Sequence, residues 1–178
     1  MKERYSGFTL IEMLVVMGIL VILMTMGIAA GQFAIERANR IQHASAVDQL
    51  YQGLQAYYTD NREYPPTLDF TDFSTALSPS GVLGKYIDQN AFEGGSDATY
   101  YYDTNTDTKQ TVIVCVSLGG IDDGNERGAY CNGNGFGDLP FTSTNKVTKK
   151  DLTAEEFAPL MGQFPISSNW LASDKNWE

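Results

Sequence analysis

The sequence predicts an α+β fold, in which one long N-terminal helix packs on a small antiparallel β-sheet. Two observations lead to this prediction. An apolar run near the N-terminus continues into an amphipathic helical pattern, and the first proline of the chain is Pro65. Farther on, two aromatic and β-branched segments, residues 99–103 and 110–118, flank the polar residues 104–109. Such a pattern is typical of two strands joined as a hairpin. The hairpin gives the helix a sheet on which to pack.

The N-terminal apolar run is long enough to cross a bilayer. Residues 13–35 are 23 consecutive residues without a charge, and about 20 suffice for a transmembrane helix. Glu12 precedes them directly, and an ionised carboxylate within a span costs at least about 2.5–3.5 kcal/mol. We therefore expect Glu12 to have a partner or a role. Lys2 and Arg4 favour a cytoplasmic N-terminus, with the rest of the chain outside.

The helical pattern extends beyond this span. Between residues 38 and 58, small and apolar residues recur at steps of three and four with polar residues between them. We therefore predict one helix from about residue 8 to about residue 58, roughly 75 Å long at 1.5 Å per residue. Its first half is apolar on all sides, as in a stalk, whereas its second half has a single apolar face for packing.

Residues 7–12, Gly-Phe-Thr-Leu-Ile-Glu, stand between a short basic leader and the apolar run. This arrangement resembles the class III signal of type IV pilins and type II secretion pseudopilins. The resemblance implies that a membrane aspartyl peptidase, prepilin peptidase, cleaves after Gly7 and that the new N-terminal Phe8 is methylated. It also implies assembly roles for Phe8 and Glu12, which lie four residues apart on one helix face.

The resemblance further implies the pilin fold and its organisation. The leader is 1–7, the transmembrane and stalk helix 8–35, the amphipathic part of the same helix 36–60, and the globular head 61–178. Residues 57–66, Tyr-Tyr-Thr-Asp-Asn-Arg-Glu-Tyr-Pro-Pro, look like the helix exit of the family. Many type IV pilins carry a proline in mid-stalk, and this chain departs from them by having none there.

The function implied is that of a structural subunit, not an enzyme, in a type IV pilus filament. Its partners are copies of itself in a helical filament, prepilin peptidase, the assembly machinery in the membrane, and lipid before assembly. The subunit would cross the cytoplasmic membrane once, head outside, and then enter an extracellular pilus. Fibres of this family serve adhesion, twitching motility or DNA uptake, and the sequence favours none of these. Two alternatives stay open: a type II secretion pseudopilin and a single-pass membrane-anchored binding domain.

Composition excludes some other functions. The 178 residues carry a net charge of −10, and removal of the leader, whose net charge is +1, leaves −11. Duplex nucleic acid is bound largely through basic contacts to phosphates, so we expect no duplex binding by this acidic body. The basic cluster of Lys146, Lys149 and Lys150 is expected to be a solvated loop. The single histidine, His43, and the lack of a recognisable nucleophile motif argue against catalysis.

Cys115 and Cys131 are the only cysteines, and both follow the span on the side predicted to lie outside the cytoplasm. Thiols there tend to be oxidised. A disulfide between them closes a loop of about 16 residues, worth roughly 3 kcal/mol on a loop-entropy model. The alternative is two unpaired thiols, with one buried on a strand. The spacing does not fit a zinc site, because no second cysteine pair accompanies it.

Two acidic groups offer oxygen ligands for calcium, which major pseudopilins bind in a C-terminal loop. They are Asp103, Asn105 and Asp107, and Asp122, Asp123 and Glu126. The first group has the initial spacing of an EF-hand loop, but Thr108 and Val114 replace the glycine and glutamate that such a loop requires. We therefore expect solvated acidic loops and no cofactor, with calcium as the alternative.

Local signals predict three further features. Residues 71–77 are expected to form a short helix, and the glycine-rich residues 119–137 an exposed, irregular loop. Thr153 and Glu156 have the spacing of a capping box, which predicts that a short helix starts there. Trp170 and Trp177 have no assigned element.

Overall fold

The computed structural model describes residues 9–66, 73–92, 96–118, 127–141 and 144–170. The chain divides into two compact units, residues 1–38 and 39–178. The second unit contains an antiparallel sheet with helices on both faces, so the predicted α+β fold is confirmed.

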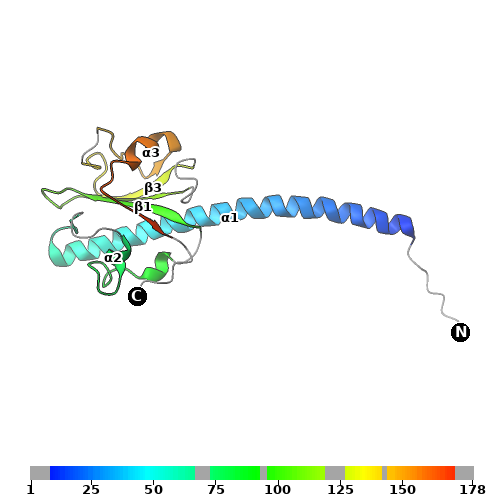
Figure 1. The fold of residues 1–178 in the computed structure, drawn as a ribbon, viewed down its shortest axis with the longest axis horizontal. Helices are drawn as coiled ribbons and strands as arrows, with labels where there is room; N and C mark the ends of the chain where they lie inside the picture. The colour runs from blue at the N-terminus through cyan, green and yellow to red at the C-terminus, as the bar shows by residue number, and fades with distance from the viewer. Residues whose placement is uncertain (1–8, 67–72, 93–95, 119–126, 142–143, 171–178) are drawn as a thin grey trace. The chain divides into compact units, whose positions relative to one another are not determined.

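The first element, α1, is a single 52-residue helix, Leu10–Asn61 (Figure 1). The predicted long helix is therefore confirmed, although its expected first residue, Phe8, lies outside the described residues. The helix ends where Arg62 adopts a left-handed conformation, with φ of 65°, and donates its N–H to the Tyr58 carbonyl at 2.8 Å. A left-handed residue is a common helix stop, and Pro65 follows it closely.

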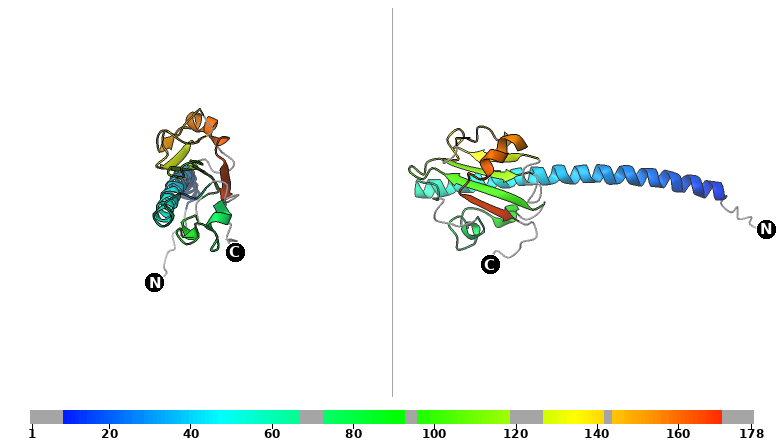
Figure 2. Two further views of the ribbon diagram at one scale, coloured as in Figure 1. Left: turned by 90° about the vertical axis from the view of Figure 1, so that its left-hand side faces the viewer. Right: turned by 45° about the horizontal axis from the view of Figure 1, so that its top comes forward.

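The sheet has five antiparallel strands in the order β4-β3-β2-β1-β5 (Figure 2). The strands are β1 Ala98–Thr104, β2 Val112–Ser117, β3 Ala129–Gly133, β4 Asp151–Leu152 and β5 Ile166–Trp170. The predicted hairpin is formed by β1 and β2, in which Tyr102 lies opposite Val114. Its strands occupy the middle of the sheet and are covered on both faces.

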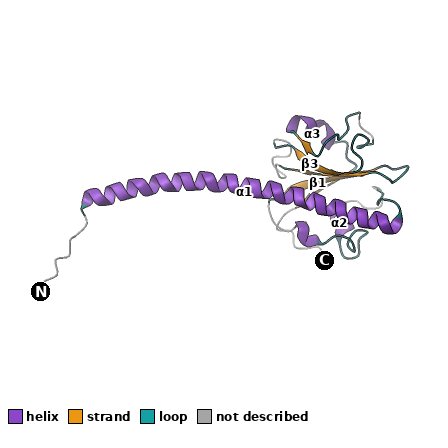
Figure 3. Ribbon diagram, turned by 180° about the vertical axis from the view of Figure 1, so that it is seen from behind, coloured by secondary structure: helices purple, strands orange, loops and turns teal. Residues whose placement is uncertain are grey.

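The two faces of the sheet belong to two hydrophobic clusters. Tyr100 and Tyr102 of β1 pack in the cluster that contains the buried face of α1, whereas Tyr101 between them packs in the other cluster. This is the alternation expected of a strand. Figure 3 shows the second part of α1 on one side of the sheet and α3 on the other. Leu50 and Leu54 of α1 are fully buried.

The second face is covered by α3, Ala154–Met161. Its predicted capping box is confirmed: Glu156 donates its N–H to Thr153 Oγ1, and Thr153 donates its N–H to Glu156 Oε2 at 2.9 Å. Phe157 and Leu160 of this helix are buried. Two short elements complete the fold, α2 Phe73–Leu77 and the 3₁₀ helix η1 Gln89–Phe92. The predicted helix at 71–77 corresponds to α2; its first two residues lie outside the described residues.

The prediction of an exposed, irregular loop at 119–137 is wrong for residues 129–133. They form β3, in which Ala129 and Cys131 are buried, while residues 119–126 lie outside the described residues. The many glycines hide this short strand, because its pairing with β2 is a long-range contact that local composition does not reveal. Gly128 and Gly133, with φ of 75° and 152°, stand at the two ends of the pairing segment.

Candidate functional site

The candidate site is the start of α1, where the sequence predicts processing and assembly. Thr9 donates its N–H to Glu12 Oε2 at 2.9 Å and its hydroxyl to the same oxygen at 2.8 Å. Glu12 in turn donates its N–H to Thr9 Oγ1 at 3.4 Å. These reciprocal bonds form a capping box, which satisfies backbone donors at a helix start. They fix the first turn of α1 and hold the Glu12 carboxylate against its own helix.

Glu12, which we expected to have a partner or a role, therefore has a hydrogen-bond partner in its own chain, Thr9. The signal was present in the sequence as Thr9-x-x-Glu12, the same spacing that correctly predicts the start of α3 at Thr153 and Glu156. Thr9 is thus a site residue that the predicted processing and assembly roles do not include. Gly7 and Phe8, the residues expected at the cleavage and methylation site, lie outside the described residues.

The part of α1 that follows Glu12 presents an apolar surface. Its large apolar side chains are exposed from Leu10 to Ile35. A Cβ added at Gly18, Gly27 or Gly31 would meet no atom within 4 Å beyond its chain neighbours and the nearby backbone of its own helix. Within the described part of the chain, α1 is the one helix long and apolar enough to cross a membrane. This surface can be covered by lipid or by the helices of other subunits.

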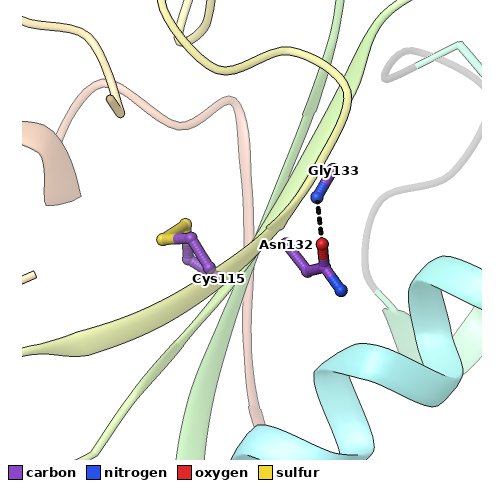
Figure 4. The surroundings of a disulfide bond; sticks show 4 residues. Cys115, Asn132 and Gly133 are labelled. Carbon is purple, nitrogen blue, oxygen red and sulfur yellow. Dashed lines mark hydrogen bonds between the residues drawn. A yellow bond between two sulfur atoms is a disulfide. The ribbon is translucent and has the colours of Figure 1, made fainter. Parts of the chain in front are cut away.

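The disulfide expected between Cys115 and Cys131 is present, with an S–S distance of 2.01 Å. The two cysteines lie directly opposite each other on β2 and β3, and both are fully buried. In Figure 4 the disulfide stands on one side of β3 and the side chain of Asn132 points to the other, towards α1. The disulfide thus joins the two strands on the face that α3 covers.

On the opposite face, a polar contact joins α1 to β3. Asp48 of α1 accepts hydrogen bonds from the Tyr130 hydroxyl at 2.9 Å and from Asn132 Nδ2 at 2.6 Å. Burial, followed by the hydrogen bond to Asp48, raises the pKa of Tyr130 to about 12. Hydrogen bonds to a charged group are stronger than neutral ones. Asp48 therefore fixes the position of the helix over β3, a role that sequence spacing could not reveal.

The first group of calcium candidates is engaged by neighbouring backbone. Asp103 is buried and accepts the Phe141 N–H at 3.0 Å, and burial raises the pKa of Asp103 to about 6. Asn105 accepts the N–H groups of Asp107 at 3.0 Å and of Thr108 at 2.9 Å, which shapes the β1–β2 turn. Among described residues, no three His, Cys, Asp or Glu side chains gather in one potential metal site.

The second calcium group, Asp122, Asp123 and Glu126, lies outside the described residues.

The basic cluster of Lys146, Lys149 and Lys150, expected to be a solvated loop, is only partly so. Lys146 donates its ammonium protons to the carbonyls of Asp138 at 2.5 Å and Pro140 at 3.0 Å. Lys149 forms an ion pair with Glu156 at 2.9 Å. Lys150 is exposed, as expected. Lys146 therefore organises the loop before β4, and its positive charge is already engaged.

Comparison with known proteins bears on the start of the chain. A family model described as the prokaryotic N-terminal methylation motif matches residues 3–28. The match includes Gly7, Phe8, Thr9 and Glu12, and it confirms the resemblance seen at residues 7–12. No curated protein and no solved structure matches the chain.

Proposed function

From the premise that residues 3–28 are the prepilin-type signal of type IV pilins and pseudopilins, we propose that this protein is a structural subunit of a type IV pilus. It is processed between Gly7 and Phe8 and assembled through its N-terminal helix. The observation that carries the proposal is the matched signal running without a break into the exposed, uncharged part of α1. The role is structural and not catalytic.

Before assembly, the apolar part of α1 lies in the cytoplasmic membrane and the head lies outside the cytoplasm. In the pilus, the same surface is covered by the corresponding helices of other subunits. Lipid already shields these side chains from water, so helix association depends on packing contacts and interhelical polar contacts. Gly27 and Gly31 have the G-x-x-x-G spacing that allows helices to approach closely.

Glu12 changes partner in this mechanism. In the isolated subunit, Thr9 donates two hydrogen bonds to the carboxylate, which offsets part of the cost of a charge at the membrane. During assembly, the methylated amine of Phe8 from an incoming subunit approaches the Glu12 of a neighbour. An ion pair in such a low-dielectric setting selects one register more than it adds stability.

Processing is the direct test. The mature protein should begin at Phe8 with an N-methyl group, and Gly7→Val should leave the full-length chain in the membrane. Ser6→Ala is the matched control beside the cleavage site and should be processed normally. Intact-mass measurement of sheared fibres gives the answer. Fibres whose subunits retain Met1 would contradict the proposal and favour an uncleaved membrane-anchored domain.

A pseudopilin shares the same signal, and calcium separates the two functions. We propose that the head folds without calcium, because backbone groups already engage Asp103 and Asn105. The melting temperature should therefore be the same in millimolar calcium and in millimolar magnesium. By contrast, a ligand that binds only the folded head raises the melting temperature of the head. A calcium-specific rise of several degrees, lost in Asp107→Ala or Asp122→Ala, would favour the secretion pseudopilin.

A further inference from the structure

Two arginines of the second unit line the same hollow. Arg40 comes from α1, and Arg127 lies just before β3. The hollow has a volume of about 270 Å³ and opens to the surface beside the start of α3. Its lining is formed by Arg40, Arg127, Asp151, Leu152, Thr153 and Ala154. Neither the signal at residues 3–28 nor the disulfide accounts for this arrangement.

The chemistry of the lining suits a singly charged phosphate group. A guanidinium presents a planar fork of donors that matches phosphate oxygens, often through two parallel hydrogen bonds. The lining contains two such positive groups and one carboxylate, that of Asp151. Within this lining the guanidinium groups outnumber the carboxylate, which favours an anion, and the single negative charge of a phosphodiester needs less compensation than the double charge of inorganic phosphate.

The place of Arg40 in the chain indicates the source of this phosphodiester. Arg40 follows Ile35, the last residue of the uncharged run, by only five positions. Five residues span about 7.5 Å as a helix and at most about 18 Å when fully extended. Whatever the arrangement of the two units, Arg40 stays near the surface of a membrane that holds residues 13–35. Phospholipid headgroups lie at that level, and basic pockets there bind them.

We propose that this hollow binds the phosphodiester of a membrane phospholipid, with Arg40 and Arg127 holding the phosphate oxygens. The inference rests on the membrane stage of the proposed function and adds a specific lipid contact to it. The bound headgroup holds the head at the membrane surface before assembly. It leaves when the subunit is extracted into the filament.

The test uses the full chain, purified in detergent without phospholipid and titrated with phosphatidylglycerol. Native mass spectrometry measures the fraction of chain carrying one lipid. Replacing both arginines, by Arg40→Gln with Arg127→Gln, should weaken binding about tenfold or more, as expected for the loss of charge-assisted hydrogen bonds. Arg37→Gln removes an exposed arginine of the same helix that does not line the hollow. It should bind like the wild type.

Asp151→Asn removes the carboxylate from the lining and should tighten lipid binding several-fold, a result that damage to the fold would not produce. Equal loss in Arg37→Gln and in the double variant would overturn the proposal, because the attraction would then be general. If a galactolipid without phosphate bound as well as phosphatidylglycerol, the proposal would also be overturned, because the phosphodiester would not be recognised. Displacement of the lipid by micromolar inorganic phosphate would identify a free-phosphate site instead. Fibre formation is scored separately, so a chain that binds lipid but forms no fibres contradicts only the proposed function.

Discussion

The two halves of α1 share one helical backbone but use their side chains in opposite ways. Leu20, in the first half, exposes 51% of its surface, whereas Leu50, in the second half, exposes none. The second half buries its apolar face within its own head, against β1 and β2. The large apolar side chains of the first half, from Leu10 to Ile35, are exposed. The comparison indicates that the second half stabilises the fold and that the first half is built for partners outside the chain.

The largest effect is expected from a matched pair of leucine-to-alanine substitutions, one in each half of α1. Leu50→Ala should destabilise the head by about 2–5 kcal/mol, because it removes buried contacts and leaves a cavity. Leu20→Ala should change head stability by no more than about 0.5 kcal/mol. Chemical unfolding of the full chain in detergent, followed by near-ultraviolet circular dichroism, measures both. An equal loss for the two variants would show that the halves are not energetically separate.

Two glycines, Gly27 in the first half of α1 and Gly53 in the second half, provide a second comparison of the two halves. A Cβ at Gly53 would lie 2.1 Å from Cγ1 of Ile87, a buried side chain, whereas a Cβ at Gly27 would meet no atom within 4 Å beyond its chain neighbours and nearby helix backbone. Gly53→Ala should therefore cost about 1–3 kcal/mol through overpacking. Gly27→Ala should leave the head unchanged and raise helicity, since alanine favours a helix by about 1 kcal/mol over glycine. Thermal unfolding and far-ultraviolet circular dichroism report the two effects. A neutral Gly53→Ala would indicate that Ile87 moves freely.

The polar contact of the second half comes next. Asp48→Ala should cost about 1–3 kcal/mol, because Tyr130 and Asn132 lose their shared acceptor. Gln49→Ala is the matched control: it removes an exposed side chain whose bond, to Ser45, is local to the helix. Urea unfolding of both variants gives the difference. If Gln49→Ala lost as much stability, the effect would be one of helix formation rather than of docking on β3.

The smallest expected effect is that of His43, a buried residue of the second half whose Nε2 lies 3.1 Å from Ser96 Oγ. Burial lowers its pKa below the ordinary value of 6.5. The unfolded chain therefore binds the proton more readily, and His43 should reduce head stability as pH falls through 6.5. His43→Gln should remove this component. The measurement is the melting temperature of both proteins from pH 7.5 to pH 5.5, and parallel curves would contradict the assignment.

Asp103 acts in the opposite direction and must be separated from His43. Its pKa is raised from 3.8 to about 6, so the stability that it contributes is present below pH 4 and is lost as pH rises towards 6. Asp103→Asn keeps an acceptor for the Phe141 N–H and removes the buried charge. The variant should therefore gain stability relative to wild type as pH rises from 4 to 7, whereas His43→Gln should gain as pH falls. If the difference in stability between Asp103→Asn and wild type did not change from pH 4 to pH 7, the raised pKa of Asp103 would be refuted.

Sequence patterns predicted what depends on neighbours in the chain. The two halves of α1, the hairpin of β1 and β2, and the start of α3 all follow from periodicity, β-branched runs or caps within a few residues. The strands β3, β4 and β5 were missed, since pairings such as Ala98 with Trp170 join distant segments. In the candidate site, Glu12 was found from the motif, and Thr9 was overlooked beside it. The Asp48 contact with β3 has no local signal at all.

The position of β5 has a consequence for the order of events during synthesis. The strand pairs with β1, which precedes it by more than sixty residues, and forms the edge of the sheet. Until residues 166–170 emerge, the backbone of β1 has an open side, and open strand edges promote aggregation. The hairpin of β1 and β2 can form early because its contacts are local. Completion of the head therefore waits for β5, and a chain interrupted before this strand would carry an open side of β1 together with the exposed apolar surface of α1.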